Sequence, residues 1–206
     1  MKYLELRKKL KEFVVFSVSD VKKIDPSSNC LRRIYEWQEK GYIKKIIKGH
    51  YIFSDLELNE QIFFILANKI YEPSYISFEI ALSYYRLIPE SVYGITSATS
   101  RKTSHFKTHL AEFYYHSVKP SLMFGYKLIK YQDQVFKIAE VEKAFLDYLY
   151  IKPHIKEIKD FEGLRIDKQN FLEQVSKEKI NEYLKIIDST VLSRRVRKFM
   201  RYMKNA

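Results

Sequence analysis

The first 53 residues constrain the fold most tightly, because short amphipathic segments alternate there with strong turn signals. Residues 2–12 space their leucines along one helical face, which predicts a first helix. Residues 14–24 open a second helix, with Ser19 as its N-cap. The pair Asp25-Pro26 then breaks the chain. Two short helices separated by a turn are therefore expected before residue 27.

A third helix and a hairpin follow. The helix is expected to begin at Ser27 or Ser28 and to end at Gly41. Residues 42–47 and 50–53 are rich in β-formers and are separated by a two-residue turn, which predicts a β-hairpin. Three helices followed by a hairpin are typical of a winged helix-turn-helix domain, which we place at residues 1–56.

In such a domain the third helix enters the DNA major groove by its N-terminal part, and the hairpin, or wing, lies along the adjacent backbone. With Leu31, Ile34 and Tyr35 turned inward, arginine and asparagine side chains face outward near the helix start. These side chains pair with the edges of guanine and adenine. The residues expected to read bases are Ser28, Asn29, Arg32 and Arg33. Those expected to meet phosphates from the wing are Lys44, Lys45, Lys48 and His50. If the winged helix docks on a protein instead, these residues are ordinary surface.

The net charge of +12 is concentrated at the two ends of the chain. Residues 1–55 hold 13 basic and 7 acidic side chains, and the last 14 residues hold 6 basic and no acidic ones. Residues 56–192 carry no net charge. Positive charge gathered in two places favours a polyanion as partner, because each neutralised phosphate releases a counterion. Solvated lysines on helix faces are the alternative.

Several functional classes are disfavoured. One cysteine cannot form an internal disulfide, and five scattered glycines make neither a dinucleotide fingerprint nor a phosphate-binding loop. His105 and His109 lack the carboxylate partners of a metal site, and Glu142, Lys143 and Asp147 are explained by an ion-paired surface helix. No uncharged run is long enough to cross a bilayer, so we expect a cytoplasmic protein. We expect no metal, no cofactor and no enzymatic activity.

The rest of the chain, residues 57–206, predicts a mixed α/β domain, so the fold class is α+β. Helices are expected at residues 59–71, after Ser77, and at 139–151, with several strands between residues 92 and 136.

Residues 177–203 predict one long C-terminal helix with an apolar face and a basic end. Four interpretations of it compete: phosphate contacts beside the winged helix, a dimerisation or partner-docking helix, a membrane-surface helix, and a core helix whose basic end complements its dipole. The residues expected to contact phosphates there are Arg194, Arg195, Arg197, Lys198 and Arg201.

The strings PSYISFEIALSYYRLIPESVYGITSATSRKTSHF (residues 73–106), FYYHSV, LMFGY and IAEVEKAFLDYLY (residues 138–150) occur in this order. Together with the N-terminal pattern they resemble the AbiEi-type antitoxins of type IV toxin-antitoxin systems, which act in abortive infection. The resemblance covers about residues 10–150. Arg86 and Ala111 stand where its pattern leads us to expect turn glycines.

The resemblance implies a winged-helix repressor that binds double-stranded DNA at its own promoter and opposes a nucleotidyltransferase-like toxin. A homodimer on DNA is a further expectation. Two other classes remain open: a protein-interaction module whose winged helix and basic tail bind an acidic protein, and a nuclease fused to a winged helix.

Overall fold

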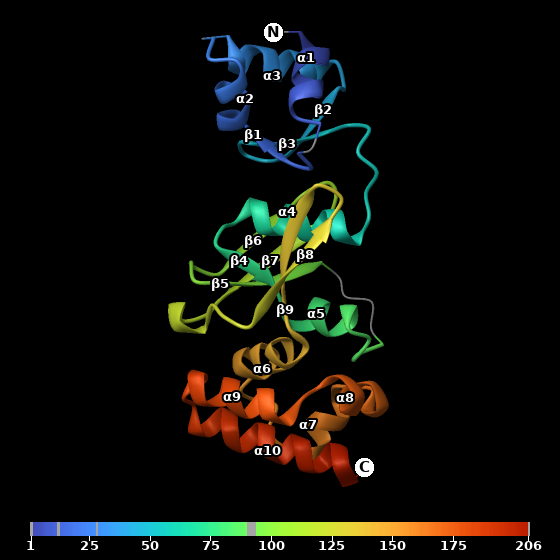
Figure 1. The fold of residues 1–206 in the computed structure, drawn as a ribbon, viewed down its shortest axis with the longest axis vertical. Helices are drawn as coiled ribbons and strands as arrows, with labels where there is room; N and C mark the ends of the chain where they lie inside the picture. Colours follow the sequence, from blue (N-terminus) through green and yellow to red (C-terminus); the bar gives the residue numbers. More distant parts are fainter. Residues whose placement is uncertain (1, 12, 28, 90–93, 206) are drawn as a thin grey trace.

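The computed structural model describes residues 2–11, 13–27, 29–89 and 94–205. Over these described residues it has an α+β fold with many helices and two separate sheets, one three-stranded and one six-stranded. Figure 1 shows an elongated molecule, with the N-terminal helices at one end and the C-terminal helices at the opposite end. None of the described helices is both long and apolar enough to span a bilayer.

The N-terminal unit, which we define as residues 2–53, contains the predicted helices and hairpin. Its elements are α1 (Tyr3–Lys9), β1 (Phe16–Ser17), α2 (Val18–Ile24), α3 (Cys30–Glu39), β2 (Ile43–Ile47) and β3 (His50–Phe53). The strands form an antiparallel sheet of order β1-β3-β2. The N-cap of α2 is Ser17 rather than Ser19: the Ser17 hydroxyl accepts a hydrogen bond from the Asp20 amide. Ser17 is also the last residue that pairs with β3, so the helix begins directly where the strand ends.

The central strand of the three-stranded sheet, β3, is buried on both faces. Tyr51 and Phe53 face the N-terminal unit's own core, which includes Leu6 and Ile34. Ile52 points to the other face and belongs, together with Val14, Val15 and Ile46, to the large core of the rest of the chain. The alternation of side chains along β3 therefore attaches the N-terminal unit to the remainder of the molecule.

The six-stranded sheet occupies the middle of the molecule and has the order β6-β7-β5-β4-β9-β8. Neighbours pair antiparallel except β5 with β7 and β4 with β9, which are parallel. Its strands are β4 (Ser74–Ile76), β5 (Ile95–Thr99), β6 (Ser104–Lys107), β7 (Glu112–Ser117), β8 (Tyr126–Tyr131) and β9 (Gln134–Ala139). A short 3-10 helix, η1 (Pro120–Leu122), precedes β8. A tight turn joins β8 to β9, with Gln132 at φ 52°.

Helices cover this sheet. α4 (Glu60–Ile70) lies between the sheet and the N-terminal unit, whereas α5 (Phe78–Tyr84) and α6 (Val141–Ile151) lie toward the C-terminal helices (Figure 1). Arg86, which ends the α5 segment, has φ 58°, the left-handed conformation that glycine adopts most easily. The expectation of a turn glycine at this position thus matches the backbone, although the residue is arginine.

The C-terminal part is a group of four helices: α7 (Ile158–Gly163), α8 (Lys168–Gln174), α9 (Lys177–Ile187) and α10 (Thr190–Asn205). The prediction of one long helix over residues 177–203 is wrong. Asp188 adopts a left-handed conformation, φ 48° and ψ 52°, which ends α9 and lets α10 fold back beside it. Apolar spacing continues across the break because both helices bury a face on the same core.

Candidate nucleic-acid interface

The orientation of α3 differs from the predicted one. Cys30, Ile34 and Trp37 are its buried residues, whereas Leu31 and Tyr35 are 58% and 63% exposed. The apolar positions of this helix form two overlapping stripes, and the core takes the one that contains Trp37. As a result, an apolar and an aromatic side chain stand on the solvent face that was expected to be polar.

Two of the expected base-reading residues are accessible on this face. Asn29 is exposed, and its side chain makes no capping hydrogen bond to α3. Arg32 donates to Glu36 at 2.9 Å, one turn along the helix, and its side chain is 77% exposed. An exposed pair of this kind stabilises a helix by only about 0.3–0.5 kcal/mol, so Arg32 can exchange its partner at low cost. Ser28 lies outside the described residues.

Arg33 has a different role from the one expected. Its guanidinium forms an ion pair with Asp25 and lies 3.4 Å from the Ser27 hydroxyl. The side chain is only 28% exposed, and that of Asp25 only 13%. Burial opposes ionisation of Asp25, but the hydrogen bonds from Ser27 and the Arg33 charge outweigh it and lower the pKa of this carboxyl. Arg33 therefore holds the start of α3 against the end of α2 and is not free to reach a base.

The hairpin presents lysines close to α3. Lys44, Lys45 and Lys48 are exposed, and no ion pair found in the described part of the chain involves them. A register shift between Lys45 and Ile47 bends β2 near the hairpin turn, which Gly49 makes at φ 83°. His50 fits its expected role less well, because it is half-buried and its Nδ1 is enclosed without a hydrogen-bond partner among the described residues.

The basic residues of α10 do not lie near the proposed DNA-binding face of α3. α10 is at the opposite end of the molecule from α3, so it does not add phosphate contacts beside the N-terminal unit (Figure 1). Arg194, Arg197 and Arg201 are exposed, and Lys198 forms an ion pair with Glu157.

The expected phosphate contact of Arg195 is wrong, because this side chain is 7% exposed. Its guanidinium donates to three carbonyl oxygens at the end of α6 and just beyond: Leu149 at 3.0 Å, Lys152 at 2.6 Å and Ile155 at 2.6 Å. Carbonyls at a helix C-terminus lack partners within the helix and carry partial negative charge, so a buried cation is stabilised there.

A buried polar cluster joins α6 to β4, and sequence reasoning missed it. Lys143 and Asp147, expected on a surface helix, are 0% and 2% exposed and form an ion pair. The Tyr75 and Ser77 hydroxyls each donate to Asp147 Oδ2 at 2.8 Å, and Lys143 Nζ lies 2.7 Å from the Tyr75 hydroxyl. Burial raises the pKa of Asp147 and lowers the pKa of Lys143, while the opposite charge of each partner counteracts both shifts. The cluster is closed to solvent, so its role is structural.

Glu142 and Glu140 connect the same region to α9. Glu142, 4% exposed, accepts a hydrogen bond from the Ser176 amide at 2.9 Å, at the N-terminus of α9. Glu140 forms an ion pair with Lys179 at 2.8 Å and accepts from the Tyr183 hydroxyl. Lys143 and Asp147 therefore link α6 to β4, whereas Glu140 and Glu142 link the start of α6 to α9.

His105, which the sequence analysis considered as a metal ligand, lies in β6. His105 contacts Glu112 at 2.9 Å and stacks on Tyr114. Within the described residues, no three His, Cys, Asp or Glu side chains are grouped as metal ligands. No protein-family model matches the chain, and no curated protein matches it. The candidate site described here is the exposed face of α3 together with the hairpin.

Proposed function

We propose that the chain is a sequence-specific DNA-binding repressor whose N-terminal unit is a winged helix, with α3 as recognition helix and the β2–β3 hairpin as wing. The observation that carries this proposal is that α3 contacts β2, the first strand of the hairpin, and that α3 and the hairpin both leave polar or positively charged side chains exposed. Asn29 and Arg32 are exposed at the start of α3, and three exposed lysines follow on the hairpin. Base-reading groups beside phosphate-binding groups are what a winged helix needs.

The exposed apolar side chains of α3 fit the same function. Leu31 lies among Asn29, Arg32 and Tyr35 on the solvent face of the helix. In the major groove an apolar side chain distinguishes thymine by its methyl group, whereas arginine pairs with guanine and asparagine with adenine. The proposed interface therefore reads a mixed sequence, with Arg33 positioning the helix rather than touching a base.

The first experiment is fluorescence anisotropy of the full chain on its own upstream promoter DNA and on a scrambled duplex, each across a salt series. Binding to the promoter should be tighter by about a thousandfold or more. Equal and steeply salt-dependent affinity for both duplexes would reduce the function to non-specific attraction, and no binding to either would contradict it.

Arg32→Ala should relax discrimination at one position of the promoter site by about 1–3 kcal/mol, because a bidentate contact to guanine is lost. Base-by-base substitution of the site, measured by anisotropy, locates that position. The matched control is Glu36→Gln, which removes the ion-pair partner of Arg32 but leaves the guanidinium in place. A uniform loss of affinity across all sequences for Arg32→Ala would show that this residue contacts a phosphate.

Lys48→Ala should weaken binding to every duplex alike and lower the slope of log K against log salt by about one, since one phosphate contact disappears. The salt series on promoter and scrambled DNA measures both effects. Lys185→Ala, a change of the same charge at an exposed position of α9, serves as control and should leave the slope unchanged. A change of specificity without a change of slope would be the contrary result.

We also propose that the chain is the antitoxin of a type IV pair and opposes a nucleotidyltransferase-like toxin encoded beside it. The resemblance of residues 73–106 and 138–150 to AbiEi-type antitoxins supports this part. The test is growth of cells that express the toxin with and without the chain. Arg32→Ala should still restore growth, because the strings that support the antitoxin role lie outside the N-terminal unit. Failure of the unmodified chain to restore growth would contradict the antitoxin role.

The second candidate function is a protein-interaction module, and the exposure of Leu31 and Tyr35 favours it. Exposed apolar side chains near each other often mark protein contacts. Leu31→Ala separates the two functions. On DNA it should selectively lower affinity for sites that contain thymine and have little effect where uracil replaces thymine. A module that binds protein would show no such dependence on the thymine methyl group.

A further inference from the structure

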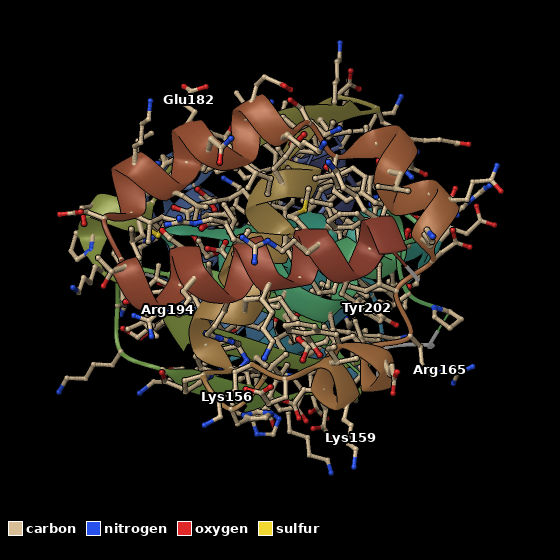
Figure 2. All side chains as sticks on the ribbon, turned by 90° about the horizontal axis from the view of Figure 1, so that it is seen from below. Lys156, Lys159, Arg165, Glu182, Arg194 and Tyr202 are labelled. Atoms are coloured by element: carbon tan, nitrogen blue, oxygen red, sulfur yellow. The ribbon has the colours of Figure 1, made fainter. Side chains whose placement is uncertain are left out.

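A groove opens between α9 and α10 at the end of the molecule remote from α3. Its volume is about 240 Å³, and its apolar floor consists of Ile180 and Leu184 from α9 with Val196 and Met200 from α10. Figure 2 views this end of the molecule, with α10 running across it between the labelled Arg194 and Tyr202. The floor is shallow, because Ile180, Leu184 and Val196 are at most 7% exposed, so it accepts the ends of aliphatic or aromatic side chains.

Cations border the groove on both sides. Arg197, Arg201 and Lys204 line it from α10, and Lys177 lines it from α9. None of the described residues that line it is acidic, and residues 190–205 contain no Asp or Glu. The acidic Glu182 of α9 lies on the side turned away from α10 (Figure 2).

The cations of α10 form a regular stripe. Arg194, Arg197, Arg201 and Lys204 follow one another at steps of three and four residues, so they lie on one helix face, and all are exposed. Lys204 and Lys177 approach each other across the groove, and the hydrogen bond with Lys177, together with its positive charge, lowers the pKa of Lys204. Like charges held together in this way are relieved when a carboxylate binds between them.

The two features together select the occupant. A nucleic-acid backbone would use the cations but leave the apolar floor empty, since it offers phosphates and sugars at that surface. An apolar helix without acids would fill the floor but leave the cations unpaired. An amphipathic helix with apolar residues at i, i+3, i+4 and i+7, flanked by Asp or Glu, satisfies both.

We propose that the α9–α10 groove is a docking site for an acidic amphipathic helix of a partner protein. The inference does not depend on DNA binding, because the helices α9 and α10 lie at the opposite end of the molecule from α3 (Figure 1). A partner can therefore dock while the N-terminal unit is occupied.

The test is selection from a displayed library of 14-residue helical peptides on the full chain, with counter-selection on Arg201→Glu/Lys204→Glu. Both positions are exposed, so the double variant should fold. Enriched peptides should be acidic and carry apolar residues at helical spacing. The enriched peptides are then synthesised, and their affinity is measured by anisotropy. Their affinity for the double variant and for Met200→Ser should be at least about tenfold lower than for the unmodified chain. Thermal unfolding checks that Met200→Ser is folded. Lys185→Glu, the same charge reversal outside the groove, should keep affinity within about twofold.

Three outcomes would overturn the proposal: no enrichment, enrichment of neutral or basic peptides, or equal binding by the double variant. A separate experiment measures the binding of a 16-base-pair duplex and of phosphatidylserine vesicles to the variant Arg32→Ala/Lys48→Ala. In this variant the proposed N-terminal DNA interface is weakened, so binding at the other end of the molecule can be detected. The proposal would fail if the duplex or the vesicles bound more tightly than every selected peptide, and if this binding required Arg201 and Lys204 but not Met200. The duplex result would then assign this end of the molecule to a nucleic acid, and the vesicle result would assign it to a membrane surface.

Discussion

Lys143→Met is expected to lower the free energy of unfolding by about 3–5 kcal/mol, because it leaves the Asp147 carboxylate buried without its counter-charge. The Tyr75 and Ser77 hydroxyls still donate to this carboxylate, but they do not neutralise it. Methionine fills nearly the same volume as the lysine stem, so the loss is electrostatic rather than a cavity effect. Urea unfolding followed by circular dichroism measures the change.

A double-mutant cycle tests the cause. Lys143→Met/Asp147→Leu removes both charges and should be more stable than Lys143→Met alone, since replacing a whole buried ion pair by apolar residues often costs little. Lys179→Met, which breaks the more exposed pair with Glu140, should cost clearly less than Lys143→Met. If the double variant lost as much stability as the two single losses added together, the two charges would not be coupled, and the geometry of the cluster would be misread.

The buried cluster around Lys143 connects parts of the fold that are distant in the sequence. Lys143 lies on α6, whereas Tyr75 and Ser77 lie at the end of β4 and the start of α5, about 70 residues earlier. Gly125, at φ 67°, passes so close that an added Cβ would stand 3.1 Å from Lys143 Cγ. Sheet, α6 and the loop before β8 therefore meet at one lysine.

The N-terminal unit is the part that sequence patterns predicted best. Turn signals at Asp25-Pro26, Gly41 and Gly49 bound segments that are short and locally determined, so the order of helices and the hairpin could be predicted. The phase of α3 could not, because Leu31 and Tyr35 repeat at the same spacing as Cys30 and Ile34. Only the packing of Trp37 against the core decides between the two stripes.

The charged residues were predicted worst, and the reason is tertiary. Helical spacing places Glu142, Lys143 and Asp147 on a helix, but whether a charge is buried depends on partners far along the chain. Arg195 looked like one more cation of a basic tail, yet it is buried against carbonyls 40 to 46 residues earlier. The end of α9 at Asp188 could not be predicted, because no glycine or proline marks it in the sequence.

Replacing Arg195 by methionine is expected to lower the free energy of unfolding by about 3 kcal/mol, which is the second large effect. Hydrogen bonds to a charged group contribute about 1.5–3 kcal/mol each, and the Ile155 carbonyl would lose the guanidinium donor at 2.6 Å. Arg195→Lys should recover only part of the loss, because one ammonium cannot reach three carbonyls that the planar guanidinium spans.

The neighbouring Arg197→Met is the matched control for this prediction, since Arg197 is exposed and its change should stay within about 0.5 kcal/mol of the unmodified chain. Urea unfolding of the three variants gives the comparison. Arg197→Met should be the most stable of the three variants, Arg195→Lys should be intermediate, and Arg195→Met should be the least stable. This order would distinguish a structural arginine from a surface arginine in the same helix. If Arg195→Met and Arg197→Met lowered the free energy of unfolding by equal and small amounts, the hydrogen bonds of Arg195 to the three carbonyls would not form in solution. Arg195 would then return to the set of cations available to a polyanion, and α10 would be attached to α6 by its apolar face alone.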